Sequence, residues 1–200
     1  ICALSVGFFL RSYLESSSQP ISVIRITTSG AVTNAALTPD GQQVVFSQSG
    51  PDGESLWLRH LTNNSQREIV KPDRVEYVGL AVSPDGAYVY ATVFSGSTSP
   101  PQLRRISVLD SAAKVIDGIT TGAAVSFSPD GRRIAYTQSR SSLRQTQLVV
   151  ANADGTEQTA VAAAVDGERS FPNFRANPVA WSPDGKTIAC AVSFSPDGAS

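Results

Sequence analysis

The 200-residue chain carries 16 basic and 17 acidic side chains, so its formal net charge of −1 attracts neither nucleic acid nor an anionic membrane surface. Hydrophobic residues make up 41% of the chain, which is enough for a buried core and excludes disordered and collagen-like classes. Charged residues make up only 16%, against about 25% in an average soluble protein. This composition favours strands and turns over long surface helices.

The chain opens with an apolar run over residues 1–10, which ends at Arg11. Ten residues cannot cross a bilayer, because a spanning helix needs about 20. The sequence starts at Ile1 and contains no Met, and it stops in a turn motif, so we expect the chain to continue beyond both ends. We therefore interpret residues 1–13 as the end of a transmembrane helix. A signal-peptide remnant and a buried segment are the alternatives.

A short polar tether over residues 14–21 follows this segment. No Lys or Arg stands between Ser12 and Pro20, which favours a non-cytoplasmic side for the residues that come after. The two cysteines, Cys2 and Cys190, fall in the apolar segment and in an expected strand, so a disulfide or a metal site is not expected from them.

The dominant signal is a turn that recurs four times at steps of 45, 45 and 54 residues. Each copy has Ser or Thr followed by Pro-Asp-Gly, and the register prolines are Pro39, Pro84, Pro129 and Pro183. Two more Pro-Asp-Gly copies, at Pro51 and Pro196, fall inside a repeat, and we expect them to be loop turns. A fixed period of this size indicates a repeat architecture.

Apolar residues alternate on both sides of each register turn. They stand four and two residues before the proline, at Ala35 and Leu37, Leu80 and Val82, Val125 and Phe127, Val179 and Trp181. They stand again five and seven residues after it, at Val44 and Phe46, Val89 and Ala91, Ile134 and Tyr136, Ile188 and Cys190. This period of two indicates a pair of strands, each with one buried face, joined as a hairpin.

A third and a fourth apolar run follow each complete hairpin, as residues 56–58 and 67–70 do in the first repeat. Four strands in about 45 residues are typical of one β-propeller blade. The predicted fold is all-β: a partial β-propeller over residues 22–200, with three complete four-stranded antiparallel blades and the start of a fourth.

Three finer predictions follow from this fold. The strand before each register turn should lie nearest the propeller axis, because it carries small or apolar residues. Phe46, Phe127 and Trp181 should pack between blades, while Trp57 and Tyr136 should be partly exposed. Residues 22–28 should form an outermost strand that pairs with the final blade of a closed ring.

The register turns, with strands such as residues 132–136 and 148–156, resemble the propeller repeats of the TolB-like family. Wider segments, including residues 26–30, 55–59 and 180–190, resemble the C-terminal propeller of bacterial membrane-spanning Ser/Thr protein kinases. The resemblance implies a cytoplasmic kinase domain, one transmembrane helix and then an extracytoplasmic propeller. Similar turns also occur in free periplasmic propellers and ahead of prolyl-oligopeptidase-type catalytic domains.

The sequence contains no glycine-rich phosphate loop, kinase signature or nucleophile elbow, so we expect no catalytic, cofactor or metal residues. His60, the single histidine, is interpreted as a polar residue at a strand end. The register aspartates could suggest calcium sites, but their spacing favours a role within each turn: Asp40, Asp85, Asp130 and Asp184.

Two arginine pairs, Arg104-Arg105 and Arg132-Arg133, should point to opposite faces of their strands and make no nucleic-acid patch.

Three hypotheses of function remain. The first is a non-catalytic, extracytoplasmic sensing or protein-binding module of a membrane-anchored Ser/Thr kinase, held at the cell membrane by its N-terminal segment and presenting its loops to an unknown protein or small molecule. The second is a periplasmic Tol-type envelope-complex propeller. The third is the gating propeller of a prolyl-oligopeptidase-type serine peptidase.

Overall fold

The computed structural model describes residues 23, 25–26, 30–96, 99–165, 169–170 and 179–194. The expected membrane segment, residues 1–13, and the tether, residues 14–21, lie outside these ranges. Of the expected outermost strand, only Val23, Arg25 and Ile26 are described, and none of the three is in a strand.

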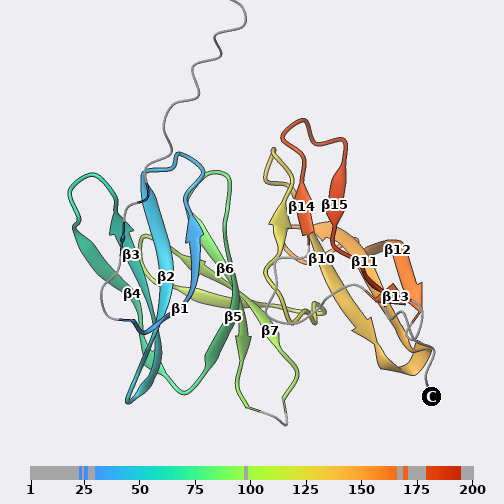
Figure 1. Ribbon diagram of the computed structural model, residues 1–200, viewed down its shortest axis with the longest axis horizontal. Coiled ribbons are helices and arrows are strands. Elements are labelled where there is room, and N and C mark those ends of the chain that lie inside the picture. Colours follow the sequence, from blue (N-terminus) through green and yellow to red (C-terminus); the bar gives the residue numbers. More distant parts are fainter. Residues whose placement is uncertain are drawn as a thin grey trace, which may run out of the picture.

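Three four-stranded antiparallel sheets follow one another along the chain, each with its strands in sequence order (Figure 1). Blade 1 contains β1 (Val32–Leu37), β2 (Gln43–Gly50), β3 (Gly53–His60) and β4 (Gln66–Asp73); blade 2 contains β5 (Glu76–Val82), β6 (Tyr88–Phe94), β7 (Gln102–Ser107) and β8 (Ala113–Ile116); blade 3 contains β9 (Ser126–Phe127), β10 (Arg133–Arg140), β11 (Gln145–Asn152) and β12 (Thr159–Val165). A fourth hairpin pairs β14 (Val179–Trp181) with β15 (Ile188–Cys190).

Two short elements complete the description: β13 (Arg169–Ser170) pairs with β16 (Ser193–Phe194), and η1 (Ser141–Leu143) is a single 3₁₀ turn. In the described part of the chain, η1 is the only helical element. The all-β, partial-propeller prediction is therefore confirmed, with three complete blades and the hairpin that starts a fourth.

The first strands of successive blades lie side by side. Strand β1 contacts β5, and β9 contacts β14. Strand β5 also approaches the chain ahead of β9 so closely that a Cβ atom on Gly79 would lie 2.2 Å from the backbone nitrogen of Ala124. The strand before each register turn is thus the innermost strand of its blade, as predicted.

The second strands of blades 2 and 3, β6 and β10, are buried on both faces, because their side chains alternate between two neighbours. The residue six positions after a register proline packs on the following blade, where it meets the residues five and seven positions after the next proline. The three contacts are Val45 with Val89 and Ala91, Tyr90 with Ile134 and Tyr136, and Ala135 with Ile188 and Cys190. Cys190 thus serves as a small apolar packing residue, as expected.

The predictions for the aromatic side chains are confirmed in part. Phe127 and Trp181 are half-buried and pack against the clusters between blades, whereas Phe46 is buried but belongs to none of the clusters between the described blades. Trp57 is partly exposed, as expected. The expectation for Tyr136 is wrong: its side chain is 0% exposed, because its hydroxyl group donates a hydrogen bond to Gln158 Oε1 (3.1 Å) inside the blade 2–3 interface.

The first repeat also departs from the expected alternation, because Ala35 is exposed and Leu37 is 56% exposed. The equivalent residues of blade 2, Leu80 and Val82, pack on blade 1. Ala35 and Leu37 therefore point away from blade 2, toward the side where no described blade covers them.

Hydrogen bonds near the axis tie each blade to the next. Asn34 Nδ2 donates to the Tyr77 carbonyl (2.5 Å), Thr92 Oγ1 to the Ala123 carbonyl (2.7 Å), and the Trp181 amide to Ser126 Oγ (2.9 Å). These polar links, added to the apolar clusters, make the successive blades a continuous scaffold for the loops.

Candidate binding site

The four register turns lie at one end of the sheets, at the top of Figure 1. In each turn the Ser or Thr hydroxyl donates to the aspartate Oδ1 over 2.5 to 2.6 Å, and the amide two residues after the aspartate donates to the same oxygen over 3.0 to 3.1 Å. The glycine that closes the turn has a φ of 67° to 72°, the left-handed conformation that glycine adopts without strain.

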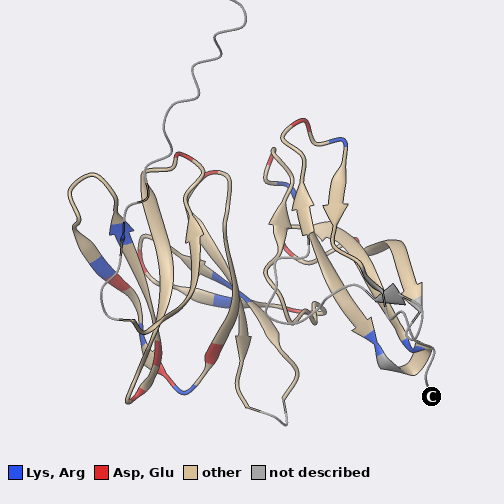
Figure 2. Cartoon of the chain, viewed as in Figure 1, with Lys and Arg blue, Asp and Glu red and all other residues tan. Residues whose placement is uncertain are grey.

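These hydrogen bonds lower the pKa of all four register aspartates, with the Ser or Thr hydroxyl as the largest cause. Acidic residues accordingly mark the tips of the turns in Figure 2. The aspartates therefore stabilise the register turns, as their spacing predicts. No group of three or more potential metal ligands occurs among the described residues.

The other side chains that the sequence singled out are separated in the structure. His60 is the last residue of β3 and is half-buried. Arg104 and Arg105 do face opposite sides of β7: Arg104 interacts electrostatically with Tyr77 on the blade 1 side, while the Arg105 guanidinium lies 4.8 Å from the centre of the Tyr88 ring on the blade 3 side.

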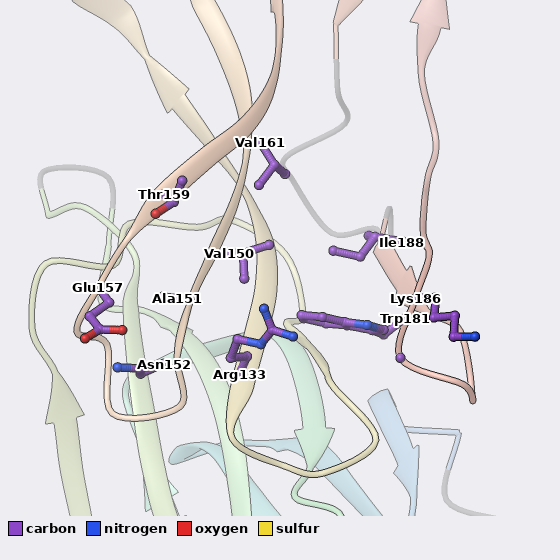
Figure 3. A pocket seen from close by; sticks show the side chains of 11 residues that line it. Arg133, Val150, Ala151, Asn152, Glu157, Thr159, Val161, Trp181, Lys186 and Ile188 are labelled. Carbon is purple, nitrogen blue, oxygen red and sulfur yellow. The ribbon is translucent and has the colours of Figure 1, made fainter.

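A groove of about 550 Å³ opens between blade 3 and the fourth hairpin (Figure 3). We call it the blade 3–4 groove. Its apolar walls include Val150 of β11, Val161 of β12 and Ile188 of β15, and its polar lining includes Arg133, Lys186, Asn152, Thr159 and Glu157. Its size falls within the range of about 300 to 1,000 Å³ that is typical of small-molecule sites.

The half-buried Trp181 and the exposed Arg133 lie next to each other in this groove. The Arg133 guanidinium lies 5.2 Å from the centre of the Trp181 ring, a cation–π geometry. The Arg133 side chain makes no hydrogen bond to any described residue, and the buried Trp181 Nε1 has no acceptor among them either. The groove therefore holds one guanidinium in contact with an aromatic ring, and its donors remain available.

The packing around Trp181 explains why the groove exists. Between blades 2 and 3, Tyr90 and Phe127 form an edge-to-face pair with ring centres 4.7 Å apart. Between blade 3 and the fourth hairpin, the residue at the Tyr90 position is Ala135 and the residue at the Phe127 position is Trp181. One large ring thus replaces two smaller ones and leaves space beside it for Arg133.

Sequence reasoning missed this site. It placed Trp181 between blades and assigned no role to Arg133. The signal was the exchange of Tyr90 for Ala135 at one register position, together with an arginine four residues after the third register proline.

Comparisons with solved structures agree with this architecture. TolB from Acinetobacter baumannii aligns with a TM-score of 0.64 and 17% identity, over 82% of this chain and 39% of that one. A protein assigned as TolB from Agrobacterium tumefaciens aligns with a TM-score of 0.64 and 15% identity, over 86% and 61% of the two chains. A prolyl endopeptidase aligns with a TM-score of 0.58 and 17% identity, over 79% and 25%.

These likenesses show a TolB-like β-propeller fold, and the chain spans less than two thirds of each of these solved chains. No family model and no curated protein matches the sequence. Within the described ranges, no helix is both long and apolar enough to span a membrane.

Proposed function

We propose that the chain is a non-catalytic β-propeller that serves as the extracytoplasmic sensing or protein-binding module of a membrane-anchored Ser/Thr protein kinase. The observation that carries the binding role is the blade 3–4 groove, in which the guanidinium of Arg133 is held over Trp181 with its donors available. The kinase parentage is supported by the sequence resemblance and by the order of an apolar segment followed by propeller repeats.

In this proposal the partner is a protein or a small molecule bound on the propeller loops, and no cofactor or nucleic acid takes part. Residues 1–13 would fix the propeller to the cell membrane, and the blades would lie on the periplasmic side. Binding of a partner to the loops would then be communicated to the kinase domain through the membrane segment.

The likeness to the two TolB structures favours one alternative, a periplasmic propeller of an envelope complex whose surface binds other proteins. The likeness to a prolyl endopeptidase favours another, a propeller that controls access to a separate serine peptidase domain. Both alternatives retain the propeller as a module without its own catalysis.

Reporter fusions to the intact protein test the location. Alkaline phosphatase folds only outside the cytoplasm, because it needs disulfides. Fused to the C-terminal side of the propeller, it should therefore be active. A green fluorescent protein that is exported unfolded at the same position should not fluoresce. The opposite pair of results would contradict an extracytoplasmic propeller.

Enzyme assays on the same intact protein distinguish the three kinds of protein to which the propeller could belong: a kinase, a peptidase and an envelope-complex subunit. The proposal expects autophosphorylation on Ser and Thr in membrane vesicles. Cleavage of a prolyl peptide without phosphorylation would assign the chain to a peptidase, and the absence of both activities would favour the envelope-complex propeller.

A further inference from the structure

The blade 3–4 groove has an uneven distribution of charge. Arg133, which is exposed, lies between Asn152 and Trp181, and Glu157 lies beyond Asn152 at one end (Figure 3). Lys186 stands at the opposite rim, with its ammonium group directed away from the other lining residues (Figure 3). The positive charge available inside the groove is therefore that of Arg133 alone.

A guanidinium is a planar donor that holds a carboxylate through two parallel hydrogen bonds. The cation–π contact with Trp181 restricts the Arg133 side chain, so less side-chain freedom is lost when an anion binds. The donors that would make these hydrogen bonds have no acceptor among the described residues. Arg133 helps to lower the pKa of the nearby Asp130 carboxyl group, but the hydrogen bonds of that carboxylate are with Ser128 and the Arg132 amide. The donors of Arg133 therefore remain open to an anion in the groove.

The remainder of the lining narrows the class of anion. Glu157 disfavours a dianion such as a phosphate monoester, because a second negative charge would be repelled without a second cation inside the groove. The walls formed by Val150, Val161 and Ile188 favour an apolar body attached to the charged group.

We infer that the blade 3–4 groove binds a monocarboxylate with an apolar body, its carboxylate paired with Arg133 above the Trp181 ring and its body against Val150, Val161 and Ile188. This inference rests on the proposed binding role and names the chemistry of the ligand. The carboxylate belongs either to a free organic acid or to the C-terminus of a peptide.

The two tryptophans of the chain provide a built-in test by nuclear magnetic resonance. Trp57 Nε1 donates to Ser55 Oγ (2.9 Å) within β3 of blade 1, so its indole signal should stay constant, whereas the Trp181 signal should respond to a ligand beside Arg133. The intact chain is titrated with phenylacetate and, as a neutral probe of the same shape, phenylacetamide. Saturable shifts of Trp181 alone, by phenylacetate alone, are the expected result.

The variant Arg133→Gln should weaken phenylacetate binding about tenfold or more, since hydrogen bonds to a charged group are the strong ones. The matched control is Arg105→Gln, which removes the other stacked arginine, on Tyr88 in blade 2, and should leave the affinity unchanged. An unchanged Trp57 signal shows that each variant is folded.

Three results would overturn the inference: no saturable shift of Trp181, equal binding of phenylacetamide, or equal binding by Arg133→Gln. Tighter binding of phenyl phosphate than of phenylacetate would also overturn it, because the ligand would then be a phosphate. A dipeptide with a free C-terminus and its C-terminal amide distinguish the two sources of carboxylate: preference for the free dipeptide over phenylacetate would assign a peptide.

The experiments that test the proposed function and those that test carboxylate binding can fail independently of each other. A cytoplasmic location of the reporter fusions would contradict an extracytoplasmic module while leaving carboxylate binding intact. A groove that does not bind carboxylate would leave the location and the kinase assay unaffected.

Discussion

Gly79 lies where β5 closely approaches the chain ahead of β9, and its replacement by alanine tests the inner packing of the propeller. A Cβ atom at this position would lie 2.2 Å from the backbone nitrogen of Ala124 and 2.6 Å from the backbone carbon of Ala123. Because both atoms belong to the main chain of the next blade, no side-chain rotation can relieve the clash, and the blades must move apart.

Overpacking a well-filled site costs about 1 to 3 kcal/mol, and a clash with backbone places Gly79→Ala in the upper part of that range, at about 2 to 3 kcal/mol. In a chain of this size, 1 kcal/mol shifts the melting temperature by about 2 to 4 °C. The variant should therefore melt about 4 to 12 °C below the unchanged chain.

The matched control is Gly50→Ala at the end of β2, where a Cβ atom would meet only the Gly53 carbonyl oxygen at an ordinary 3.6 Å. This variant should be neutral or slightly stabilising, because alanine restricts the unfolded chain. Scanning calorimetry of both variants provides the comparison. Equal melting temperatures would refute the close approach of β5 to the segment ahead of β9.

Three further predictions concern packing and titration. In urea unfolding, Phe127→Ala should lower the unfolding free energy much more than His60→Ala or Arg105→Ala. The reason is that it removes a ring that packs edge-to-face on Tyr90. Equal losses for the three variants would contradict the interface between blades 2 and 3. Burial raises the pKa of Tyr136 to about 12, above that of a tyrosine in the unfolded chain. The stability that neutral Tyr136 contributes is therefore complete below about pH 10 and is lost as the pH rises toward 12. Tyr136→Phe should flatten this alkaline fall in urea unfolding followed between pH 9 and 12, and an unchanged slope would argue against the burial. The Ser128 hydroxyl lowers the pKa of Asp130, so the stability from this pair is present above the pKa of an unfolded aspartate and is lost as the pH falls through the lower, folded pKa. Ser128→Ala should raise the pKa of Asp130, measured by carbon-13 titration. An unchanged pKa would refute the turn geometry.

The blade architecture was predictable because the register turn marks the same point in every repeat. Once the prolines are aligned, the period of two in residues such as Ile134 and Tyr136 locates the middle strands, and the spacing leaves room for two more strands. The turn role of the aspartates was predictable for the same reason, since Ser-Pro-Asp-Gly encodes its own hydrogen bonds.

The burial of a residue depends on which blade covers it, and the local sequence pattern does not contain this information. Tyr136 has a hydroxyl group that suggests an exposed edge, but Gln158 provides an acceptor from a strand turn 22 residues away. Leu37 has the same pattern as Val82, but no described blade covers it. Such differences arise from tertiary contacts rather than from the period of the sequence.

The groove was not predictable because it arises from a pair of residues in different repeats. Ala135 provides the space and Trp181 fills part of it, and their sequence separation hides the relation until the blades are packed. The contact between the Arg133 guanidinium and the Trp181 ring likewise joins residues of different repeats.

The central claim is that successive repeats form propeller blades that pack face to face. Its most direct test is the nuclear Overhauser effect between the ring protons of Tyr90 and Phe127, measured with selectively labelled tyrosine and phenylalanine. With ring centres 4.7 Å apart, in strands β6 and β9 of adjacent blades, the account predicts a strong cross-peak that disappears in Phe127→Leu. A folded chain without this cross-peak would contradict the packing of blade 2 on blade 3 and, with it, the propeller.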